Sequence, residues 1–500
     1  MNAEFFPQWD LSPCGNPQVR NIGKVEKELE FLLEKWKFCL KLRWKNGNNM
    51  LKRKIDSYLK EYYEKSSNAL FITGARQVGK TFSIREFGKN FKSFIEINFI
   101  ENPDAVELFK GAKGSADILL RLSTLTDIPM IKGDTLIFFD EVQECPDIVT
   151  AIKFLVDDGS YRYILSGSLL GVELKDIRSV PVGYMGIKEM FPIDFEEFIS
   201  CVGIRADVIA SIKEAWEKRH PVDGFIHEKM MELFRLYLIV GGMPAAVSKY
   251  IESNNLQEVL TVQQEIIQLY KKDIAKYDPD NKLYIEEIFS LIPPELNAKN
   301  KRFILKRLNE NAKYERYENS FLWLKNAGVA LPVYNVEEPK VPLLLARSRN
   351  LLKLFLNDIG LLAAQYANGI QVRIIKGDKD INFGSIYENA VAQELVAHGL
   401  WPYYYNNKKR GELDFVIEQD GKVLPIEVKS GKGYTYHRAL TNIMDCGEYD
   451  LPEALILNND NLFKDGLFLY IPVYMVMFLK KIETTPTAYK VDLGDLADSR

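Results

Sequence analysis

One stretch of the sequence decides the fold of the first half of the chain: Ala69-Leu-Phe-Ile-Thr-Gly74-Ala-Arg-Gln-Val-Gly-Lys80-Thr81. Residues 69–73 form a short apolar run, which is typical of a buried strand. Residues 74–81 fit the pattern GxxxxGK[ST], and a helix-like stretch follows at 82–90. The glycines of this pattern let the backbone curl so that its N–H groups face a phosphate at the positive end of the next helix. The stretch therefore predicts a site for a nucleoside triphosphate.

The residues of this loop have distinct expected roles. Lys80 reaches the β- and γ-phosphates, and the Thr81 hydroxyl holds Mg²⁺. ATP and Mg²⁺ are therefore the expected cofactors. The alternative is an ordinary glycine turn before a helix. The nucleotide-binding residues expected here are Gly74, Ala75, Arg76, Gln77, Val78, Gly79, Lys80 and Thr81.

An acidic motif completes the predicted site. Leu136-Ile-Phe-Phe is an apolar strand that ends in Asp140 and Glu141. In an open α/β sheet, ligands bind at the carboxyl ends of the strands. Asp140 is expected to orient Mg²⁺ through water, and Glu141 to polarise the attacking water as the general base. Many strands end in acidic residues, so this motif takes its meaning from the phosphate loop upstream.

Four apolar runs indicate the sheet that carries both motifs. Besides 69–73 they lie at 91–99, 135–141 and 161–168, with helix-like segments between them. This alternation predicts a parallel sheet with right-handed connections. The last run ends in Ser166-Gly-Ser168, where a polar side chain could sense the γ-phosphate, and Ser166 is the preferred residue. The alternative for these serines is ordinary capping of a strand end.

The composition limits the class of protein. With 500 residues, 47% apolar and 27% charged, about three globular domains are expected. A net charge of −4 excludes a general polyanion binder but leaves room for a local basic groove. The five scattered cysteines and four dispersed histidines indicate a reduced, cytoplasmic protein without a His/Cys zinc site. The longest apolar stretch, Gly466 to Leu479, is too short to span a membrane, so we expect a buried strand and helix there and no membrane partner.

The rest of the chain changes character twice. Residues 195–277 are predicted to form consecutive helices interrupted at 240–244, and 301–336 to form short helices closed by a strand. A new α/β unit begins near Leu351, and Asp420-Gly421 predicts a hairpin turn within it. The predicted divisions are an N-terminal extension (1–49), the P-loop domain (50–200), a helical lid and winged-helix-like region (201–345), a C-terminal α/β domain (346–485) and a tail (486–500).

The predicted hairpin brings charged residues together. Asp414 lies on its first strand, while Glu427 and Lys429 share one face of its second strand because side chains alternate. Glu388, on an upstream segment with helical periodicity, could join them. Carboxylates that hold Mg²⁺ beside a lysine can cleave a phosphodiester bond. The alternative is a hairpin with charges on its solvated face, and the spacing alone leaves both open.

Taken together, the motifs resemble the prokaryotic AAA-plus-like P-loop ATPases that are fused to a C-terminal domain of restriction-endonuclease (PD-(D/E)xK) type, whose function is largely unassigned. The resemblance runs from about Met50 to Leu479 and leaves the first 49 residues outside it. The stretches that carry it are GARQVGKT (74–81), LIFFDE (136–141), ILSGSLLG (164–171), FPIDFEEF (191–198), VGGMP (240–244), KLFLNDIGLL (353–362), IYENAVAQEL (386–395), GELDFVI (411–417) and PIEVKSG (425–431).

The sequence patterns and this resemblance together predict an α/β fold with three parts. These are a P-loop NTPase parallel sheet with helices on both faces, a helical lid or winged-helix middle region and, as the resemblance implies, a restriction-endonuclease-like C-terminal domain. It implies Walker A and Walker B roles for the two motifs of the sheet. It implies the nuclease-like fold more than cleavage, because a fold is often kept without its chemistry. Many members have a basic residue where this chain has Gly183-Tyr184, so a charge at the γ-phosphate would come from elsewhere, such as Arg178. The nuclease-like site implied is Glu388, Asp414, Glu427 and Lys429.

The predicted function is an ATP-binding protein and Mg²⁺-dependent AAA-type ATPase whose nucleotide state controls a nuclease-like binding domain. Two alternatives stay open: an ATP-regulated DNA nuclease, and a scaffold that binds nucleotide without hydrolysing it. DNA or a protein is the partner expected at the C-terminal domain, and a homo-oligomer is an open alternative. Replacing Glu141 separates an enzyme from a scaffold, and replacing Asp414 tests the nuclease.

Overall fold

The structure is a computed structural model. It describes residues 51–167, 183–277, 282–311, 313–366, 369–377, 383–431 and 433–482, with 275–277 as backbone only. Several sequence predictions lie outside the described residues: the N-terminal extension (1–49), Ser168, Arg178 and the tail (486–500).

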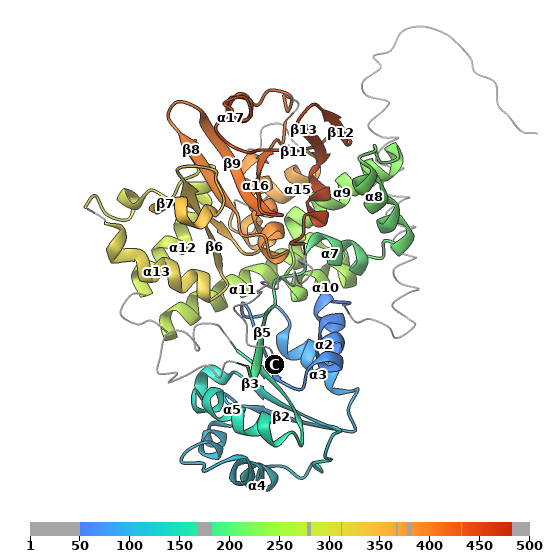
Figure 1. The fold of residues 1–500 in the computed structure, drawn as a ribbon, viewed down its shortest axis with the longest axis vertical. Coiled ribbons are helices and arrows are strands. Elements are labelled where there is room, and N and C mark those ends of the chain that lie inside the picture. Colours follow the sequence, from blue (N-terminus) through green and yellow to red (C-terminus); the bar gives the residue numbers. More distant parts are fainter. Residues whose placement is uncertain are drawn as a thin grey trace, which may run out of the picture. The chain divides into compact units, whose positions relative to one another are not determined.

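The first sheet has five strands, all parallel, in the order β2-β3-β4-β1-β5 (Figure 1). The four predicted apolar runs form its first four strands, and β5 adds an edge next to β1. Parallel strands end at the same edge of a sheet, so the phosphate loop after β1 and the acidic motif at the end of β3 lie on either side of the end of β4. The strands are β1 (Ala69–Thr73), β2 (Ser93–Asn98), β3 (Thr135–Asp140), β4 (Arg162–Ser166) and β5 (Met185–Glu189).

Helices cover both faces of this sheet because its central strands are apolar throughout. In β1, Leu70 and Ile72 pack in one core with residues of α2 and α3. Phe71, between them, packs in a second core with residues of α4 and α5 on the opposite face. The predicted parallel α/β sheet with helices on both faces is therefore confirmed. The helices are α2 (Lys54–Lys65), α3 (Lys80–Gly88), α4 (Ser115–Leu125) and α5 (Asp147–Asp158), with the 3-10 turns η1 (Pro103–Leu108) and η2 (Val142–Glu144).

Consecutive helices follow β5, as the periodicity predicted. The predicted interruption falls where α9 ends at Val240 and α10 begins at Pro244. The helices of this region are α7 (Phe195–Cys201), α8 (Ala206–Lys218), α9 (Gly224–Val240), α10 (Pro244–Ser253), α11 (Leu256–Tyr277), α12 (Lys282–Asn297) and α13 (Tyr314–Asn326), with η3 (Leu305–Arg307) between the last two.

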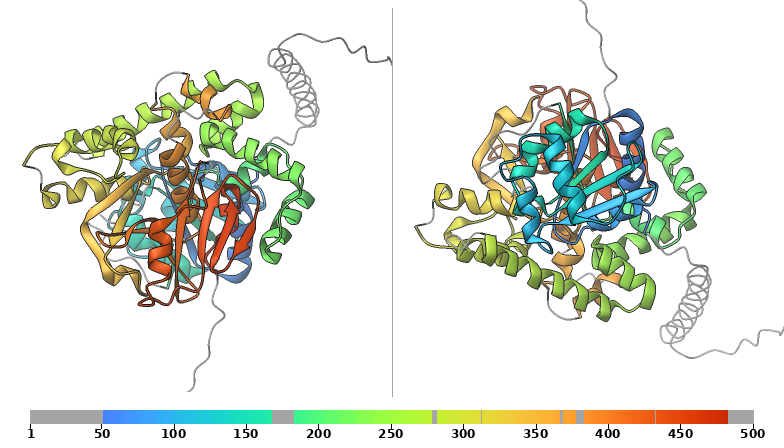
Figure 2. Two further views of the ribbon diagram at one scale, coloured as in Figure 1. Left: turned by 90° about the horizontal axis from the view of Figure 1, so that it is seen from above. Right: turned by 90° about the horizontal axis from the view of Figure 1, so that it is seen from below.

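The second sheet is mixed and has eight strands in the order β12-β13-β11-β10-β9-β8-β6-β7 (Figure 2, yellow to red in the left view). The predicted hairpin at Asp420-Gly421 joins β9 to β10, and both turn residues have positive φ, as a tight two-residue turn requires. The strands are β6 (Ala330–Val336), β7 (Arg347–Leu356), β8 (Tyr403–Asn407), β9 (Gly411–Gln419), β10 (Lys422–Val428), β11 (Ala454–Asn458), β12 (Phe463–Asp465) and β13 (Phe468–Pro472).

Strand β6, which was expected to close the middle region, lies in this second sheet. It pairs with β7 in antiparallel fashion and with β8 in parallel fashion. A division at residue 345 would therefore separate two hydrogen-bonded neighbours. The sequence does not contain this pairing, because an apolar strand reveals that it is buried but not which strand it pairs with.

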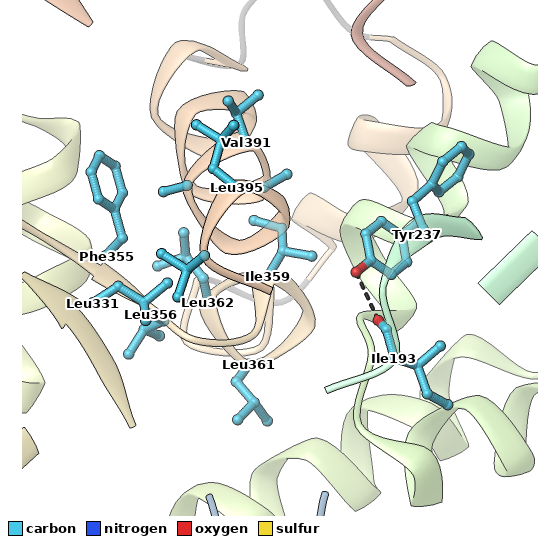
Figure 3. Packing of buried hydrophobic residues seen from close by; sticks show 14 of the residues in the cluster. Ile193, Tyr237, Leu331, Phe355, Leu356, Ile359, Leu361, Leu362, Val391 and Leu395 are labelled. Carbon is cyan, nitrogen blue, oxygen red and sulfur yellow. Dashed lines mark hydrogen bonds between the residues drawn. The ribbon is translucent and has the colours of Figure 1, made fainter. Parts of the chain in front are cut away.

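Helix α16 (Phe383–Ala397) is buried from Ser385 to Val396, and its polar residues Glu388, Asn389, Gln393 and Glu394 are buried with the apolar ones. Its Val391 and Leu395 lie close to Ile359 and Leu362 of α14 (Figure 3). The Asn389 amide binds both the N–H and the carbonyl of Leu356 at the end of β7. The remaining short helices are α14 (Ile359–Ala363), α15 (Ile370–Ile375), α17 (Arg438–Met444), η4 (Leu343–Ala346) and η5 (Val473–Phe478).

The long apolar stretch at 466–479 forms β13 and η5, which are almost entirely buried, so the predicted buried strand is confirmed and the predicted helix is a 3-10 helix. Within the described residues, no single helix is long and apolar enough to cross a membrane. One pair, α9 with α10, passes that test by length and composition only when taken together, and it is bent by 119°.

Candidate functional site

The phosphate loop follows a backbone path that requires glycine. Gly74 has a φ of +137°, and a Cβ added there would lie 2.1 Å from the Met190 carbonyl oxygen. Gly79 has a φ of +97° where the loop enters α3. Side chains are strained at such angles, whereas glycine adopts them freely. The two glycines of the motif are therefore needed by the geometry of the loop itself.

The Lys80 side chain folds back over this loop. Its Nζ donates to the carbonyl oxygens of Gly74 and Ala75, at 2.9 Å each. Burial lowers the pKa of Lys80, and the nearby carboxylates of Glu141 and Asp140 oppose that shift. The same lysine lines a pocket together with Gly74 and Glu141. An ammonium in this place suits a phosphate charge better than the carbonyl oxygens that it now contacts.

The Thr81 hydroxyl and Asp140 lie side by side, as we predicted from the sequence. Thr81 Oγ1 donates to Asp140 Oδ2 at 3.0 Å, and Asp140 is only 2% exposed. Burial raises the pKa of Asp140, and its hydrogen bonds from Ser166 and Thr81 act against that shift. A hydroxyl beside a carboxylate offers the oxygen ligands that Mg²⁺ prefers. These two residues therefore fit the expected metal.

Glu141 lines the same pocket and has a left-handed backbone conformation, with a φ of +58°. Such a conformation is uncommon for a residue with a side chain and often occurs at functional sites. Its Oε2 accepts a hydrogen bond from Gln143 Nε2 at 2.5 Å. Gln143, which the sequence did not single out, thus fixes where the candidate general base points.

Two more polar residues contact Asp140 from neighbouring strands. The buried Ser166 hydroxyl, at the end of β4, donates to Asp140 Oδ1. The Asn98 amide, at the end of β2, donates to Asp140 Oδ2 at 3.3 Å. Ser166 therefore lies beside the predicted metal ligand, and its role as a γ-phosphate sensor stays a prediction. Asn98 was missed because an isolated asparagine after a strand carries no motif.

The pocket at the phosphate loop has a cavity volume of about 50 Å³ and is open to solvent. Its other walls come from the later part of the chain: Tyr270 and Asp273 of α11, Trp323 of α13, and Ala327 and Val329 of the turn into β6. Arg76 is the arginine that lines it. Gly183-Tyr184, by contrast, forms a turn whose carbonyls accept from Asn68 Nδ2 and Ala69 N–H, so no cation is supplied from that place.

Residues far along the chain hold the phosphate loop directly. Arg76 forms an ion pair with Asp273, and its carbonyl accepts a hydrogen bond from the Tyr270 hydroxyl at 3.1 Å. At Gly328, an added Cβ would lie 2.9 Å from Ala75 N. The loop therefore contacts both α11 and the turn between α13 and β6. No sequence motif predicted these contacts.

Arg53 holds the opposite side of the loop. Its guanidinium donates to the carbonyl oxygens of Val78 at 3.0 Å and Phe191 at 2.8 Å, and to Glu197 Oε1 at 3.1 Å. Arg53 and Glu197 are each 7% exposed, so this ion pair is buried. A buried arginine needs such a complete set of acceptors. The stretch FPIDFEEF, which carries Glu197, thereby has a structural reason to lie beside the phosphate loop.

Three stretches of the resemblance meet at one joint. The Gly242 N–H donates to Asp358 Oδ2 at 2.6 Å, and its carbonyl accepts from the Ile193 N–H at 2.7 Å. A Cβ added at Gly242 would lie 2.1 Å from the Ile193 carbonyl oxygen. The Tyr237 hydroxyl donates to that same carbonyl (Figure 3). The VGGMP backbone therefore contacts both the FPIDFEEF backbone and the Asp358 side chain of KLFLNDIGLL, at a place with no room for a side chain on Gly242.

The acidic residues of the second sheet also converge. The register pairs Ile426 with Phe415, and the next step along both strands places Glu427 opposite Asp414. Asp414 Oδ2 accepts the Val428 N–H at 2.9 Å, and Lys429 Nζ lies 2.7 Å from Glu427 Oε1. Glu388 comes from α16 on the covering layer. The structure thus brings together all four residues that the sequence proposed.

These acids already have cationic partners within the chain. The fully buried Lys353 lies 2.9 Å from Glu412 Oε1, 3.7 Å from Glu388 Oε2 and 4.0 Å from Asp414 Oδ1. Lys301 contacts Glu388, and Arg302 lies 3.2 Å from Glu412. Lys301, Arg302 and Lys353 were not foreseen, because they come from a loop and a strand far from the acids in sequence. Four carboxylates (Glu388, Glu412, Asp414, Glu427) thus face four cations (Lys301, Arg302, Lys353, Lys429).

Burial controls the ionisation of this cluster. It raises the pKa of Glu388 to about 7 and of Glu427 to about 8, and the Asp414 charge adds to both shifts. Lys353 and Lys301 act against the shift at Glu388, and Lys429 acts against it at Glu427. One oxygen of each glutamate, Oε2, has no hydrogen-bond partner. The cluster therefore contains ion pairs whose mutual attraction does not fully offset the free-energy cost of removing the charges from water.

Three families match successive parts of the chain. Residues 66–199 match a family described as an AAA domain. Residues 231–371 and 383–474 match two domains of unknown function, DUF8612 and DUF4143. A search of curated proteins found no match.

Several solved structures are similar to the chain at low identity. A Walker-type ATPase of Pyrococcus abyssi is 14% identical over 64% of this chain and 97% of its own, with a TM-score of 0.39. The Aeropyrum pernix ORC1 protein in complex with DNA is 12% identical over 65% of this chain and 91% of its own, with a TM-score of 0.25. Drosophila ORC bound to DNA is 14% identical over 64% of this chain and 93% of its own, also at 0.25. These low TM-scores mark only a distant likeness.

The five-stranded parallel sheet, the glycine-dependent phosphate loop and the Thr81–Asp140 contact all lie within the residues that match the AAA family. The second, mixed sheet lies in the part matched by the two uncharacterised families, and its nuclease-like identity stays a prediction. Residues 66–199 are accordingly an AAA-like P-loop ATPase domain.

Proposed function

We propose that this chain binds ATP with Mg²⁺ at residues 74–81 and Asp140, hydrolyses it with Glu141, and thereby moves the helices that cover the phosphate loop. The second sheet would then present a different surface to its partner, a DNA or a protein, in each nucleotide state. The contacts of the phosphate loop support one part of this proposal best, namely that a movement at the loop reaches the second sheet.

The contact of the phosphate loop with the turn before β6 carries this proposal. Gly328 packs on Ala75, and β6 begins at Ala330 and pairs with β7 and β8 of the second sheet. Arg76, in the loop itself, is bound to α11 through Asp273 and Tyr270. A triphosphate that enters the loop competes for the positive charge of Arg76 and Lys80. Small changes at such a packed contact shift whole elements, because packed interfaces have discrete arrangements.

The chemistry would be divided among four side chains. When bound, Mg²⁺ supplies charge that neutralises the phosphates. Thr81 and Asp140 would hold the ion, Lys80 would leave the Gly74 and Ala75 carbonyls for the β- and γ-phosphates, and Glu141 would polarise the attacking water once it leaves Gln143.

Phosphate release and hydrogen exchange together test the proposal. The wild type, Glu141→Gln and the exposed control Glu64→Gln would be assayed for phosphate release from ATP with Mg²⁺, with and without duplex DNA. We expect Glu141→Gln to bind ATP without turnover, and amide exchange in α11 and β6 to change when ATP binds. ATP binding with no turnover in the wild type would reduce the protein to a nucleotide-binding scaffold. Unchanged amide exchange in α11 and β6 would refute only the proposed movement of these elements, and ATP hydrolysis would still stand.

A DNA nuclease is the second candidate function. It is favoured by the convergence of Glu388, Asp414, Glu427 and Lys429, and by the Oε2 atoms of the two glutamates, which accept no hydrogen bond. The ion pairs of Lys353 and Lys301 count against it, since Mg²⁺ would have to displace them. Asp414→Ala tests it directly: the variant should lose cleavage and keep ATP turnover, and wild-type protein that leaves duplex DNA intact with ATP and Mg²⁺ excludes it.

A further inference from the structure

A separate cluster lies where α7 begins and α16 ends. Asp194 caps the N-terminus of α7, while Glu394 and His398 are one helical turn apart at the end of α16. Ligand atoms of these three residues lie within 4.8 Å of one another, and no other three His, Cys, Asp or Glu residues in the described parts of the chain meet that condition. Their side chains are 6%, 0% and 3% exposed. The FPIDFEEF and IYENAVAQEL stretches therefore meet at a polar core.

The imidazole orientation is fixed by the backbone. His398 Nδ1 lies 2.9 Å from the Leu479 carbonyl oxygen, which can only accept, so Nδ1 carries the hydrogen. The other nitrogen, Nε2, then points its lone pair toward the two carboxylates. This is the tautomer that a metal ligand adopts, with its second nitrogen bound to a carbonyl.

Two of the facing atoms have no hydrogen-bond partner. Nε2 of His398 and Oε2 of Glu394 are both buried and unpartnered. Nε2 lies 3.4 Å from Asp194 Oδ2 and 3.8 Å from Glu394 Oε2, which is beyond the usual range of a hydrogen bond. Ligands that surround Zn²⁺ tetrahedrally at their normal bond lengths are about 3.4 Å apart. The gap therefore fits an ion better than a direct contact.

The outer oxygens of both carboxylates are held in place. Glu394 Oε1 accepts from the Phe195 N–H at 2.8 Å and from the Tyr237 hydroxyl at 3.1 Å. Asp194 Oδ1 accepts from the Glu197 N–H at 2.9 Å. Such bonds fix ligand orientation in metal sites. They leave Glu394 Oε2 without a hydrogen-bond partner, while Asp194 Oδ2 is contacted by Lys54.

Among the described residues, Lys54 is a cation that competes for this cluster. Its Nζ lies 2.5 Å from Asp194 Oδ2 and 2.7 Å from Glu196, and its side chain is 44% exposed. Because Lys54 reaches Asp194 from the solvent side, it can release Asp194 Oδ2 to another cation and stay paired with Glu196. It does not contact Glu394 Oε2 or His398 Nε2, which still face each other without a positive charge between them.

We propose that Asp194, Glu394 and His398 bind a divalent transition-metal ion, for which Zn²⁺ has the best-matched ligands, and that this ion ties α7 to α16. The donors are two carboxylate oxygens and one imidazole nitrogen, and the fourth position would take water from the side of Lys54. This site lacks cysteine, so it differs from the His/Cys zinc site that the sequence excluded. It is independent of the nucleotide site and would act as a structural joint.

Metal analysis of the full-length chain tests the site. Protein purified without chelators would be analysed for zinc, then stripped and reloaded with Co²⁺, whose visible absorption reports tetrahedral coordination with a nitrogen ligand. We expect about one ion per chain in the wild type and at least a tenfold weaker affinity in His398→Gln. His227→Gln is the matched control, because both nitrogens of that histidine already have protein partners.

Two further measurements keep the outcome decisive if His398→Gln does not fold. Removing the ion from the wild type should lower its melting temperature, and restoring Zn²⁺ should raise it again. Lys54→Met, which removes the competing cation, should bind Co²⁺ at least as tightly as the wild type. The proposal is overturned if the wild type binds Zn²⁺ and Co²⁺ no better than His398→Gln does, or if stripping and reloading leave its melting temperature unchanged.

Discussion

The acidic groups of the two sheets have opposite surroundings. In the first sheet, Asp140 accepts hydrogen bonds from neutral groups, the hydroxyls of Thr81 and Ser166 and the amide of Asn98. In the second sheet, Glu388 and Glu427 are paired with lysines. A carboxylate held by neutral donors has no protein cation that an incoming metal ion must displace, whereas a carboxylate beside a lysine has one. The convergence of acidic residues is therefore weaker evidence for a metal site than the absence of a cation beside them.

The sharpest test of this comparison is Lys353→Met. Lys353 is fully buried and faces Glu388, Glu412 and Asp414, so its removal leaves carboxylates uncompensated in the core. We expect a loss of roughly 3–5 kcal/mol in the free energy of unfolding, measured by urea denaturation. Lys422→Met, which removes an exposed ion pair, should cost less than about 1 kcal/mol. Equal effects of the two substitutions would show that Lys353 does not neutralise the cluster.

Lys80→Ala examines the other side of the comparison. If the phosphate loop of the first sheet binds the phosphates of ATP, loss of the Lys80 ammonium should reduce ATP turnover by roughly 100-fold or more, while the melting temperature changes little. The exposed Lys89→Ala, directly after the end of the same helix, is the control and should turn over ATP like the wild type. Wild-type turnover in Lys80→Ala would remove this lysine from the proposed mechanism.

The pH dependence of stability provides a third test. Burial raises the pKa of Glu427 to about 8 from its ordinary 4.5, so the folded chain keeps this proton where the unfolded chain has lost it. Its contribution is therefore complete below about pH 4.5 and is lost as the pH rises toward 8. Glu427→Gln should flatten this decline by up to about 1.4 kcal/mol per pH unit. Unfolding curves at several pH values would show it, with the exposed Glu338→Gln expected to keep the wild-type slope.

The smallest expected effect concerns the link between the two sheets. Asp273→Asn removes the partner of Arg76 and a negative charge from the wall of the phosphate pocket. Because this ion pair is partly exposed, it contributes under about 1 kcal/mol, so ATP should bind only a few-fold more tightly. Titration with a fluorescent ATP analogue would measure the change, and Asp207→Asn, from an exposed ion pair, is the control. Weaker binding in Asp273→Asn would contradict the proposed competition for Arg76.

Much of the nucleotide site could be predicted because its parts are local. The phosphate loop, Thr81 and the strand that ends in Asp140 are each encoded within a few residues, and the parallel sheet brings them together by its own geometry. The hairpin around Asp420-Gly421 was predictable for the same reason, and it sets Glu427 opposite Asp414. The roles of these residues in catalysis stay predictions.

The contacts that give each site its character could not be predicted. Arg53, Asn98 and Lys353 are ordinary residues in the sequence, and each becomes important only through a partner from another element. The position of β6 in the second sheet belongs to the same class, because an apolar strand does not specify its neighbour.

The sequence by itself determined the local frame of this protein: the strands and helices, the glycine-dependent phosphate loop and the hairpin that carries the acids. Those features depend on short-range backbone conformation and on hydrophobic periodicity, which are read within a few residues. Only the tertiary structure decided which charges are neutralised and which are left to bind a ligand. Such charges interact across folded elements, and burial makes each of these interactions stronger than it would be in water.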